Sequence, residues 1–213
     1  MDSPEQTEAY AAADFSEANQ LFCSRACSYL TKTTGSLLDL GCGSGGLLVE
    51  LAHSLPTWRM IGIDAGPNML NLAQQAIAQA RLAHRVSCLK VHLPRDEALL
   101  EPHLPFDAIV SNSLLHHLAD PMTLWTTISR LATPGLRVVV MDLSRPASTE
   151  QARDLVNAHT QGASPVLQED FYNSLLAAWR VDEVKDQLDA MGWSHWQVAM
   201  VSNRHWMAMG AFA

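Results

Sequence analysis

The segment LLDLGCGSGGL, residues 37–47, decides the fold of this chain. It opens with a short apolar-rich run, Leu37–Leu40, and continues into a turn with glycine at four of its six positions, 41–46. A helical pattern then extends to about Ser54. An apolar run followed by glycines and a helical pattern predicts a buried strand, a tight turn and a helix. The glycines let the backbone approach a ligand, and the first turn of the helix leaves N–H groups unpaired.

The same alternation of strand and helix continues outward from this segment. Further strands are predicted at Arg59–Asp64, Val86–Val91, Phe106–Ser111 and Leu136–Leu143, with helices at 68–83 and 121–132. This order predicts an α/β fold with parallel strands and helices on both faces of the sheet. Residues 1–35 read as a helix that Gly35 ends. After the fifth strand we predict helices at 149–159, 168–179 and 181–191, and a hairpin of strands 196–201 and 206–212.

Composition and charge restrict the class of protein. The 213 residues suffice for one domain, and the net charge is -8 without any run of Lys or Arg. Binding to nucleic acid or to an anionic membrane needs a clustered basic surface, so neither is expected. We expect no signal peptide, because the N-terminal residues are acidic and polar, and no membrane span, because no apolar stretch reaches the ~18–20 residues that one needs. Four cysteines without a Cys-x-x-Cys pair predict no metal site. We therefore expect a cytoplasmic protein that acts on a small molecule.

The glycine turn alone fits two cofactors. Gly41, Gly43 and Gly46 match the dinucleotide fingerprint, and Asp64, 23 positions after Gly41, suits the hydroxyl groups of a ribose. Asp39 favours the second cofactor, because its carboxylate would repel a pyrophosphate but attract the ammonium group of S-adenosylmethionine. The sequence thus favours S-adenosylmethionine, and an NAD(P)-dependent oxidoreductase remains the alternative.

Four motifs in order carry a resemblance to a known family. They are LLDLGCGSGGL (37–47), GIDAGPNML (62–70), FDAIVSNSLLHHLADP (106–121) and the Thr-Pro-Gly turn before VVVMDL. In these motifs the chain resembles class I methyltransferases of the ubiquinone and menaquinone biosynthesis type. The resemblance implies a Rossmann-like three-layer sandwich whose seven-stranded, mostly parallel sheet has an antiparallel last strand. It also implies an enzyme that converts S-adenosyl-L-methionine to S-adenosyl-L-homocysteine.

The resemblance further implies where the cofactor binds. The methionine end would contact the first strand and the turn, Asp64 would hold the ribose, and Ala65 and Met69 would flank the adenosine. Relatives usually carry an Asp after the third strand that binds the adenine, whereas this chain has His92 there, followed by Leu93; a shift that places Asp96 at this position is an alternative. The remaining expected contacts are Asp39, Gly41, Cys42, Gly43 and Gly45 at the methionine end, and Ser111, Asn112 and Ser113 on the methyl side.

Related enzymes often fold an N-terminal helix over the cofactor. The resemblance therefore predicts a helical lid at residues 1–35, with Tyr10 or Phe15 as the aromatic that covers the site, and a methyltransferase domain at 36–213. Such a lid would exclude water from the sulfonium.

His116 and His117 are the predicted catalytic residues. They follow the fourth strand, at the sheet edge where ligands bind, and histidine is the side chain most often used as a base near neutral pH. A packing or helix-capping role is the alternative for either one. Arg145 could hold an acidic group of the acceptor or lie on the surface, whereas His159 and His205 are expected to be solvated or structural.

The sequence leaves the methyl acceptor open. Oxygen is the favoured acceptor atom, with nitrogen, sulfur and carbon as alternatives. The residues Ser-Asn-Ser-Leu after the fourth strand differ from the Asn-Pro-Pro-Tyr type of enzymes that methylate planar amino groups. A catalytically silent binding subunit is a third hypothesis. The oligomeric state stays open, and a homodimer is one option.

Overall fold

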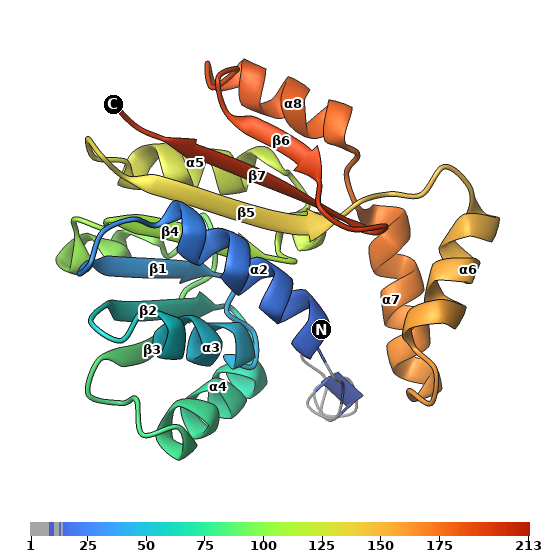
Figure 1. Cartoon of the computed structure of the whole chain (residues 1–213), viewed down its shortest axis with the longest axis horizontal. Helices are drawn as coiled ribbons and strands as arrows, with labels where there is room; N and C mark the ends of the chain where they lie inside the picture. Colours follow the sequence, from blue (N-terminus) through green and yellow to red (C-terminus); the bar gives the residue numbers. More distant parts are fainter. Residues whose placement is uncertain (1–8, 11–12, 14) are drawn as a thin grey trace.

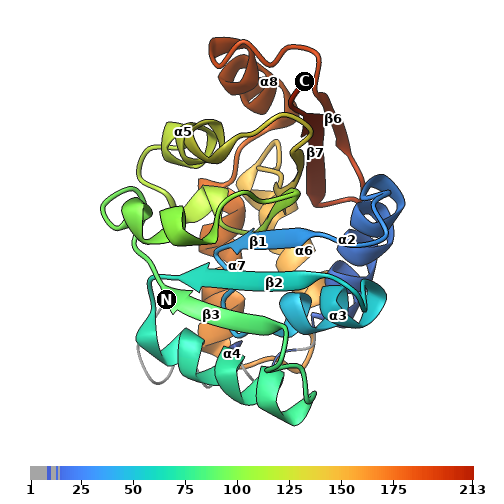
Figure 2. The same ribbon diagram turned by 90° about the vertical axis from the view of Figure 1, so that its left-hand side faces the viewer.

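A seven-stranded sheet forms the centre of the protein (Figures 1 and 2). The computed structural model describes residues 9–10, 13 and 15–213. The strand order is β3-β2-β1-β4-β5-β7-β6, and β7 runs in the direction opposite to the other six strands. This confirms the predicted fold, including the antiparallel last strand and the terminal hairpin. The strands are β1 Ser36–Leu40, β2 Arg59–Asp64, β3 Val86–Lys90, β4 Ala108–Asn112, β5 Arg137–Leu143, β6 Gln197–Met200 and β7 His205–Ala211.

Helices cover both faces of the sheet, and one helix pair lies beyond its edge. Figure 2 shows α2 and α3 on one face and α5 on the other, with α4 beside β3. Figure 1 shows α6 and α7 side by side beyond the carboxyl ends of the central strands. The helices are α2 Ser16–Tyr29, α3 Gly46–Ser54, α4 Pro67–Gln79, α5 Met122–Leu131, α6 Thr149–His159, α7 Pro165–Ala177 and α8 Val181–Ala190, with short 3-10 helices η1 Glu97–His103 and η2 Leu115–His117.

Strand β5 is apolar on both faces because both faces are covered. Val138 and Val140 belong to one core cluster with Trp125, and Val139 and Met141 belong to the other with Phe22. Side chains of a strand alternate between the two faces, so a strand buried on both sides reads as a continuous apolar run. The sequence VVVM therefore predicts the position of β5 in the sheet correctly.

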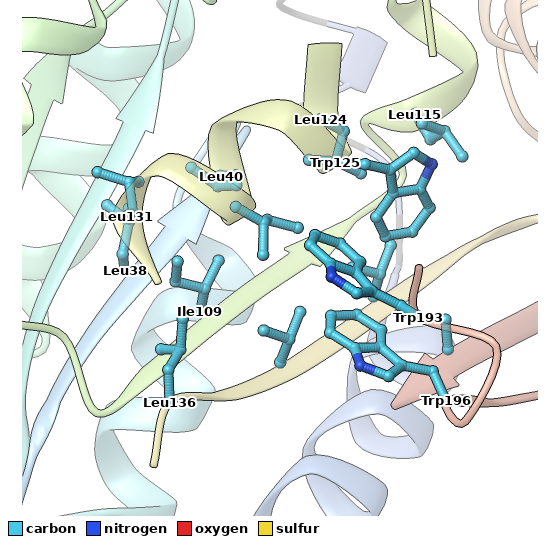
Figure 3. Packing of buried hydrophobic residues seen from close by; sticks show 14 of the residues in the cluster. Leu38, Leu40, Ile109, Leu115, Leu124, Trp125, Leu131, Leu136, Trp193 and Trp196 are labelled. Atoms are coloured by element: carbon cyan, nitrogen blue, oxygen red, sulfur yellow. The ribbon is translucent and has the colours of Figure 1, made fainter. Parts of the chain in front are cut away.

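Three tryptophans close the core on the α5 and α8 face (Figure 3). The rings of Trp193 and Trp196 stack with centroids 4.6 Å apart, and Trp125 meets Trp196 edge to face at 6.5 Å. Offset and edge-to-face arrangements of this kind are the favoured geometries of aromatic pairs. They hold the β6–β7 hairpin against the parallel part of the sheet.

Several helix boundaries differ from those predicted, most of all in the N-terminal helix, in α7 and in α4, which ends at Gln79 instead of Ala83. The N-terminal helix α2 ends at Tyr29 instead of continuing to Gly35, since the run Thr31-Lys-Thr-Thr34 is rich in β-branched residues, which disfavour helix. Helix α7 begins at Pro165 instead of Gln168, because proline suits the first helical position and the Ser164 hydroxyl accepts a bond from the N–H of Leu167.

Helix α2 packs into the same core as α3. The lid assigned to residues 1–35 extends over residues 1–8, 11, 12 and 14, which lie outside the described residues, and the division into lid and domain stays a prediction.

Gly210 in β7 gives a test of this packing. A Cβ at this position would lie 2.0 Å from the ring of Trp196, so Gly210→Ala must displace the stacked tryptophans. We expect the free energy of unfolding to fall by about 2–3 kcal/mol, measured by urea denaturation. Gly46→Ala is the matched control, because its Cβ would meet only Asn19 at an ordinary 3.6 Å, and we expect no loss of stability. Equal effects of the two changes would contradict the packing described.

Candidate functional site

A cavity of about 570 Å³ lies at the carboxyl edge of the central strands. Its walls come from the glycine turn after β1, the ends of β4 and β5, the β6–β7 turn, the start of α2 and the α6–α7 pair. Ligands of open α/β sheets bind at this edge. Among the residues predicted for the site, those that line the cavity are Tyr10, Phe15, Asp39, Gly41, Cys42, Gly43, Asn112, Ser113, His116 and His117.

The glycine turn is fixed to β2 and open toward the cavity. The N–H groups of Gly41 and Cys42 both donate to the carbonyl of Ile63, at 2.9 and 2.8 Å. Gly43 has a φ of +52°, and a Cβ there would meet nothing within 4 Å, so a ligand can approach its backbone. Gly45 differs, because its Cβ would lie 2.9 Å from Ala73 of α4. It permits close packing of the turn against α4 and does not line the cavity.

Asp39 carries the clearest sign of an unfilled interaction. Asp39 is among the residues that line the cavity, it is 1% exposed, and neither of its buried carboxylate oxygens has a hydrogen-bond partner among the described residues. Burial, together with the nearby charge of Asp64, raises the pKa of Asp39 to about 7. A buried carboxylate of this kind is costly unless a cation or hydrogen-bond donors meet it. The ammonium group predicted from the sequence would supply both.

Asp64 and the two aromatic residues lie next to this position. The carboxylate of Asp64 accepts the N–H of Gly43 at 3.0 Å and of Gly66 at 2.8 Å, which ties the turn to the start of α4. The rings of Tyr10 and Phe15 are 4.4 Å apart and both line the cavity. Burial and the charge of Asp64 raise the pKa of Tyr10 to about 12. Its hydroxyl therefore stays protonated and can donate a hydrogen bond.

Several predicted contacts lie outside the cavity wall. Ser111 is 1% exposed and its hydroxyl donates to the carbonyl of Leu40 at 2.8 Å, so it joins β4 to β1. His92 is exposed, and Asp96 accepts its backbone N–H at 3.2 Å while pairing with Arg95. The geometry does not choose between His92 and Asp96 for an adenine contact. The predicted residues outside the lining are Gly45, Asp64, Ala65, Met69, His92, Leu93 and Ser111.

The two predicted catalytic histidines differ in their surroundings. Nδ1 of His116 lies 2.5 Å from the carboxylate of Asp142, and the two side chains are 3% and 2% exposed. The same carboxylate accepts the backbone N–H of His116 at 3.3 Å and of Leu143 at 2.6 Å. Asp142 therefore fixes the His116 ring and the short helix η2. Sequence analysis missed Asp142, although an acid at the end of the apolar strand RVVVMDL was a usable signal.

His117 is the accessible member of the pair. It lines the cavity and is exposed, and its ring centroid lies 4.0 Å from that of His116. The protein around the ring disfavours its charged form and, with a smaller effect of His116, lowers the pKa of His117 to about 4, although Asp142 acts in the opposite direction. Its imidazole is therefore neutral near neutral pH, which leaves a ring nitrogen lone pair available, but the low pKa makes it a weaker base than free imidazole.

A second polar group lines the cavity from the C-terminal third of the chain. It consists of His159 at the end of α6, Arg204 in the β6–β7 turn and His205 at the start of β7. No sequence pattern singles out Arg204, and the prediction for both histidines is a structural or solvated role. Arg145, the predicted alternative clamp, lies outside the lining, where it pairs with Glu183 and the carbonyl of Ala178. No set of His, Cys, Asp or Glu side chains in the described part of the chain is arranged to hold a metal ion.

Comparison with known proteins agrees with this geometry. Residues 38–138 of this chain match a family model described as a methyltransferase domain, in agreement with the resemblance to class I methyltransferases. An uncharacterized methyltransferase of Mycobacterium tuberculosis is 35% identical over 114 residues, 54% of this chain and 53% of that protein. A demethylmenaquinone methyltransferase of Lactiplantibacillus plantarum is 36% identical over 116 residues, 52% of this chain and 46% of that protein. The chain thus spans about half the length of the curated relatives it matches.

The fold is shared over a longer stretch than the sequence. The solved structure of the plantazolicin methyltransferase BpumL in complex with SAH superposes with a TM-score of 0.74 at 16% identity, over 99% of this chain and 91% of that one. The methyltransferase fold therefore includes the C-terminal hairpin and the α6–α7 pair. No helix in the described part of the chain has the length and apolar character needed to span a bilayer.

The raised pKa of Asp39 has a measurable effect on stability. The folded protein holds the Asp39 proton up to about pH 7, whereas an unfolded aspartate releases it near pH 4. Asp39 therefore causes no loss of stability below about pH 4. As the pH rises from 4 toward 7, the free energy of unfolding falls. We expect Asp39→Asn to raise the free energy of unfolding of the ligand-free protein by about 2–4 kcal/mol near pH 8, and by less than about 1 kcal/mol near pH 4.

Urea denaturation at the two pH values measures this difference. Asp154→Asn on the exposed side of α6 is the matched control, because it removes one carboxylate without changing the cavity. A gain from Asp39→Asn that is the same at both pH values, or that Asp154→Asn reproduces, would contradict the account of Asp39.

Proposed function

We propose that the protein transfers a methyl group from S-adenosylmethionine to an oxygen atom of a small-molecule acceptor. One observation carries the proposal: the buried, unpaired carboxylate of Asp39 and the neutral imidazole of His117 line the same cavity. The first suits a cationic cofactor and the second suits an acceptor that loses a proton. The cavity volume of about 570 Å³ is in the usual range for small-molecule sites.

The residues around the glycine turn would hold the cofactor. Asp39 would accept the ammonium group, the open backbone at Gly43 would lie against the methionine end, and Asp64 would meet the ribose. Tyr10 and Phe15 would cover the site. When bound, the cofactor supplies an activated methyl group on a sulfonium. The negative pyrophosphate of NAD(P) would instead face the carboxylate of Asp39, which argues against the oxidoreductase alternative.

The residues around His117 would orient the methyl acceptor and supply a base. In-line transfer needs the acceptor oxygen about 3–3.5 Å from the methyl carbon, with water excluded. His117 is placed to accept the proton of an acceptor hydroxyl as the new carbon–oxygen bond forms. The carboxylate of Asp142 would stabilise the positive charge that forms on His117. It also holds the ring of His116, which packs against the ring of His117. His116 and Asp142 are thus positioning residues, and His117 is the proposed catalytic residue.

The comparisons support this class of reaction and leave the acceptor to be proposed. The L. plantarum relative is named for demethylmenaquinone and BpumL for plantazolicin, so proteins of this fold take different acceptors. The net charge of -8 continues to disfavour a nucleic acid acceptor. The cytoplasmic location and the homodimer stay predictions.

Calorimetric titration tests the cofactor. We expect S-adenosylmethionine and S-adenosylhomocysteine to bind the wild-type protein and NAD not to bind up to about 1 mM. Because the ammonium group needs an ionised Asp39, affinity should fall by up to about tenfold for each pH unit below 7. Asp39→Asn should weaken binding by at least ~30-fold and remove this pH dependence. Absence of S-adenosylhomocysteine binding by the wild type would overturn the proposal.

Substitution of His117 tests the base. We expect His117→Gln to lower kcat by about 100-fold with little change in the affinity for S-adenosylmethionine, because a positioned base contributes about 10²–10⁴-fold. Asp142→Asn should lower kcat less, since Asp142 acts through the position of His116 and the field at His117. Steady-state rates with a hydroxyl acceptor measure both effects. A wild-type kcat for His117→Gln would exclude His117 as the base.

A further inference from the structure

The second polar group of the cavity, His159, Arg204 and His205, contains a positive charge, which is notable in a chain of net charge -8. The Arg204 side chain is 10% exposed, and its ion-pair partner among the described residues is Glu17, whose side chain is 77% exposed. Glu17 lies in the first turn of α2 and accepts from Nη2 of Arg204 at 3.0 Å. The protein therefore buries a permanent cation in the wall of its cavity and balances it with a carboxylate that reaches in from the surface.

Hydrogen bonds determine which ring nitrogen of His205 carries the proton. The Ser202 hydroxyl oxygen accepts the N–H groups of Arg204 at 3.2 Å and His205 at 3.0 Å, which occupies both of its lone pairs. It also lies 3.0 Å from Nδ1 of His205, so its own hydrogen donates to that nitrogen. Burial, followed by the charge of Arg204, lowers the pKa of His205 to about 4. The neutral ring therefore carries its proton on Nε2, which is hydrogen bonded to nothing else among the described residues.

The same reasoning applies to His159. Its Nε2 lies 3.1 Å from Nη1 of Arg204 and 3.3 Å from Nδ2 of Asn203, and both of these groups donate. Nε2 of His159 must accept, so the proton of the neutral ring is on Nδ1. Arg204, His159 and His205 together offer only donors to whatever else enters this end of the cavity.

We propose that this cluster binds a carboxylate group of the methyl acceptor, with Arg204 supplying the charge and His205 a hydrogen bond from Nε2. The inference rests on the proposed function, and the carboxylate is separate from the oxygen that receives the methyl group. A guanidinium with adjacent N–H donors is the usual protein partner of a carboxylate. Glu17 already places one at Arg204, and a substrate carboxylate would displace this exposed side chain.

The charge pattern of the whole cavity fits this assignment. Asp39 lines the cavity beside the glycine turn with the charge of Asp64 nearby, and its ionised form suits a cationic ammonium. Arg204 adds a positive charge to the cavity wall, in which Glu17, Asp39 and Asp170 are the carboxyl groups. An acceptor fixed by its carboxylate at Arg204 and by its hydroxyl at His117 would be held at two points, which limits its orientation relative to the methyl group.

Two variants that break the same ion pair test the proposal. Arg204→Met removes the cation, whereas Glu17→Gln removes only the competing carboxylate. The probes are 4-hydroxybenzoate, salicylate and malate with their corresponding amides, titrated by calorimetry into protein saturated with S-adenosylhomocysteine. We expect at least one acid to bind the wild type about tenfold or more tightly than its amide. Arg204→Met should weaken that acid by roughly 30-fold, and Glu17→Gln should leave it unchanged or bind it more tightly.

A structural role for Arg204 gives a different result. If Arg204 only fastens α2 to the β6–β7 turn, the two variants should change acid binding alike. That outcome, or acids that bind the wild type no better than their amides or not at all up to about 10 mM, would overturn the proposal. Should Arg204→Met fail to fold, His205→Phe removes the Nε2 donor at similar volume and should weaken the acid by about fivefold. If the wild type does not bind S-adenosylhomocysteine, the proposed function fails instead.

Discussion

Burial of the Asp39 carboxylate at the end of β1 is the constraint on which the cavity depends. Strand β1 is in the middle of the sheet, so a side chain at its carboxyl end is surrounded by protein from β2 and β4. Neither oxygen of Asp39 has a partner among the described residues, and the protein offsets part of the cost by raising the pKa of the group to about 7. A buried carboxylate that destabilises the ligand-free protein and is stabilised by a bound cation is typical of a binding site.

The glycine turn and Asp64 maintain this arrangement. Two N–H groups of the turn bind the carbonyl of Ile63, and the carboxylate of Asp64 accepts one N–H from the turn and one from the start of α4. Gly45 brings the turn against Ala73 of α4. The turn is thus held on three sides by β2, Asp64 and α4. Its backbone at Gly43 stays open, and Asp39 and Gly43 line the same cavity.

The sequence predicted the features that depend on local patterns. Strand–helix alternation predicted the fold, and the motif at 37–47 predicted the turn, because glycine spacing and apolar runs are local signals. Local patterns do not reveal contacts between residues that are distant in the sequence. The Ser111 hydroxyl bonds to the carbonyl of Leu40 across the sheet, and Asp142, at the end of an apolar strand, fixes His116. Arg204 and His205 enter the cavity only because β7 is inserted beside β5 in the antiparallel direction, which brings a late turn to the ligand edge.

The central claim is that the carboxylate of Asp39 receives the cationic end of the cofactor. The number of protons released when S-adenosylhomocysteine binds tests it most directly, measured by calorimetry near pH 6.5 in buffers that differ in ionisation enthalpy. In the ligand-free protein most Asp39 is protonated at that pH, and a bound ammonium group requires the ionised form. We predict release of roughly half a proton or more per cofactor bound, and none for Asp39→Asn. Binding of the cofactor by the wild type without proton release would contradict the account.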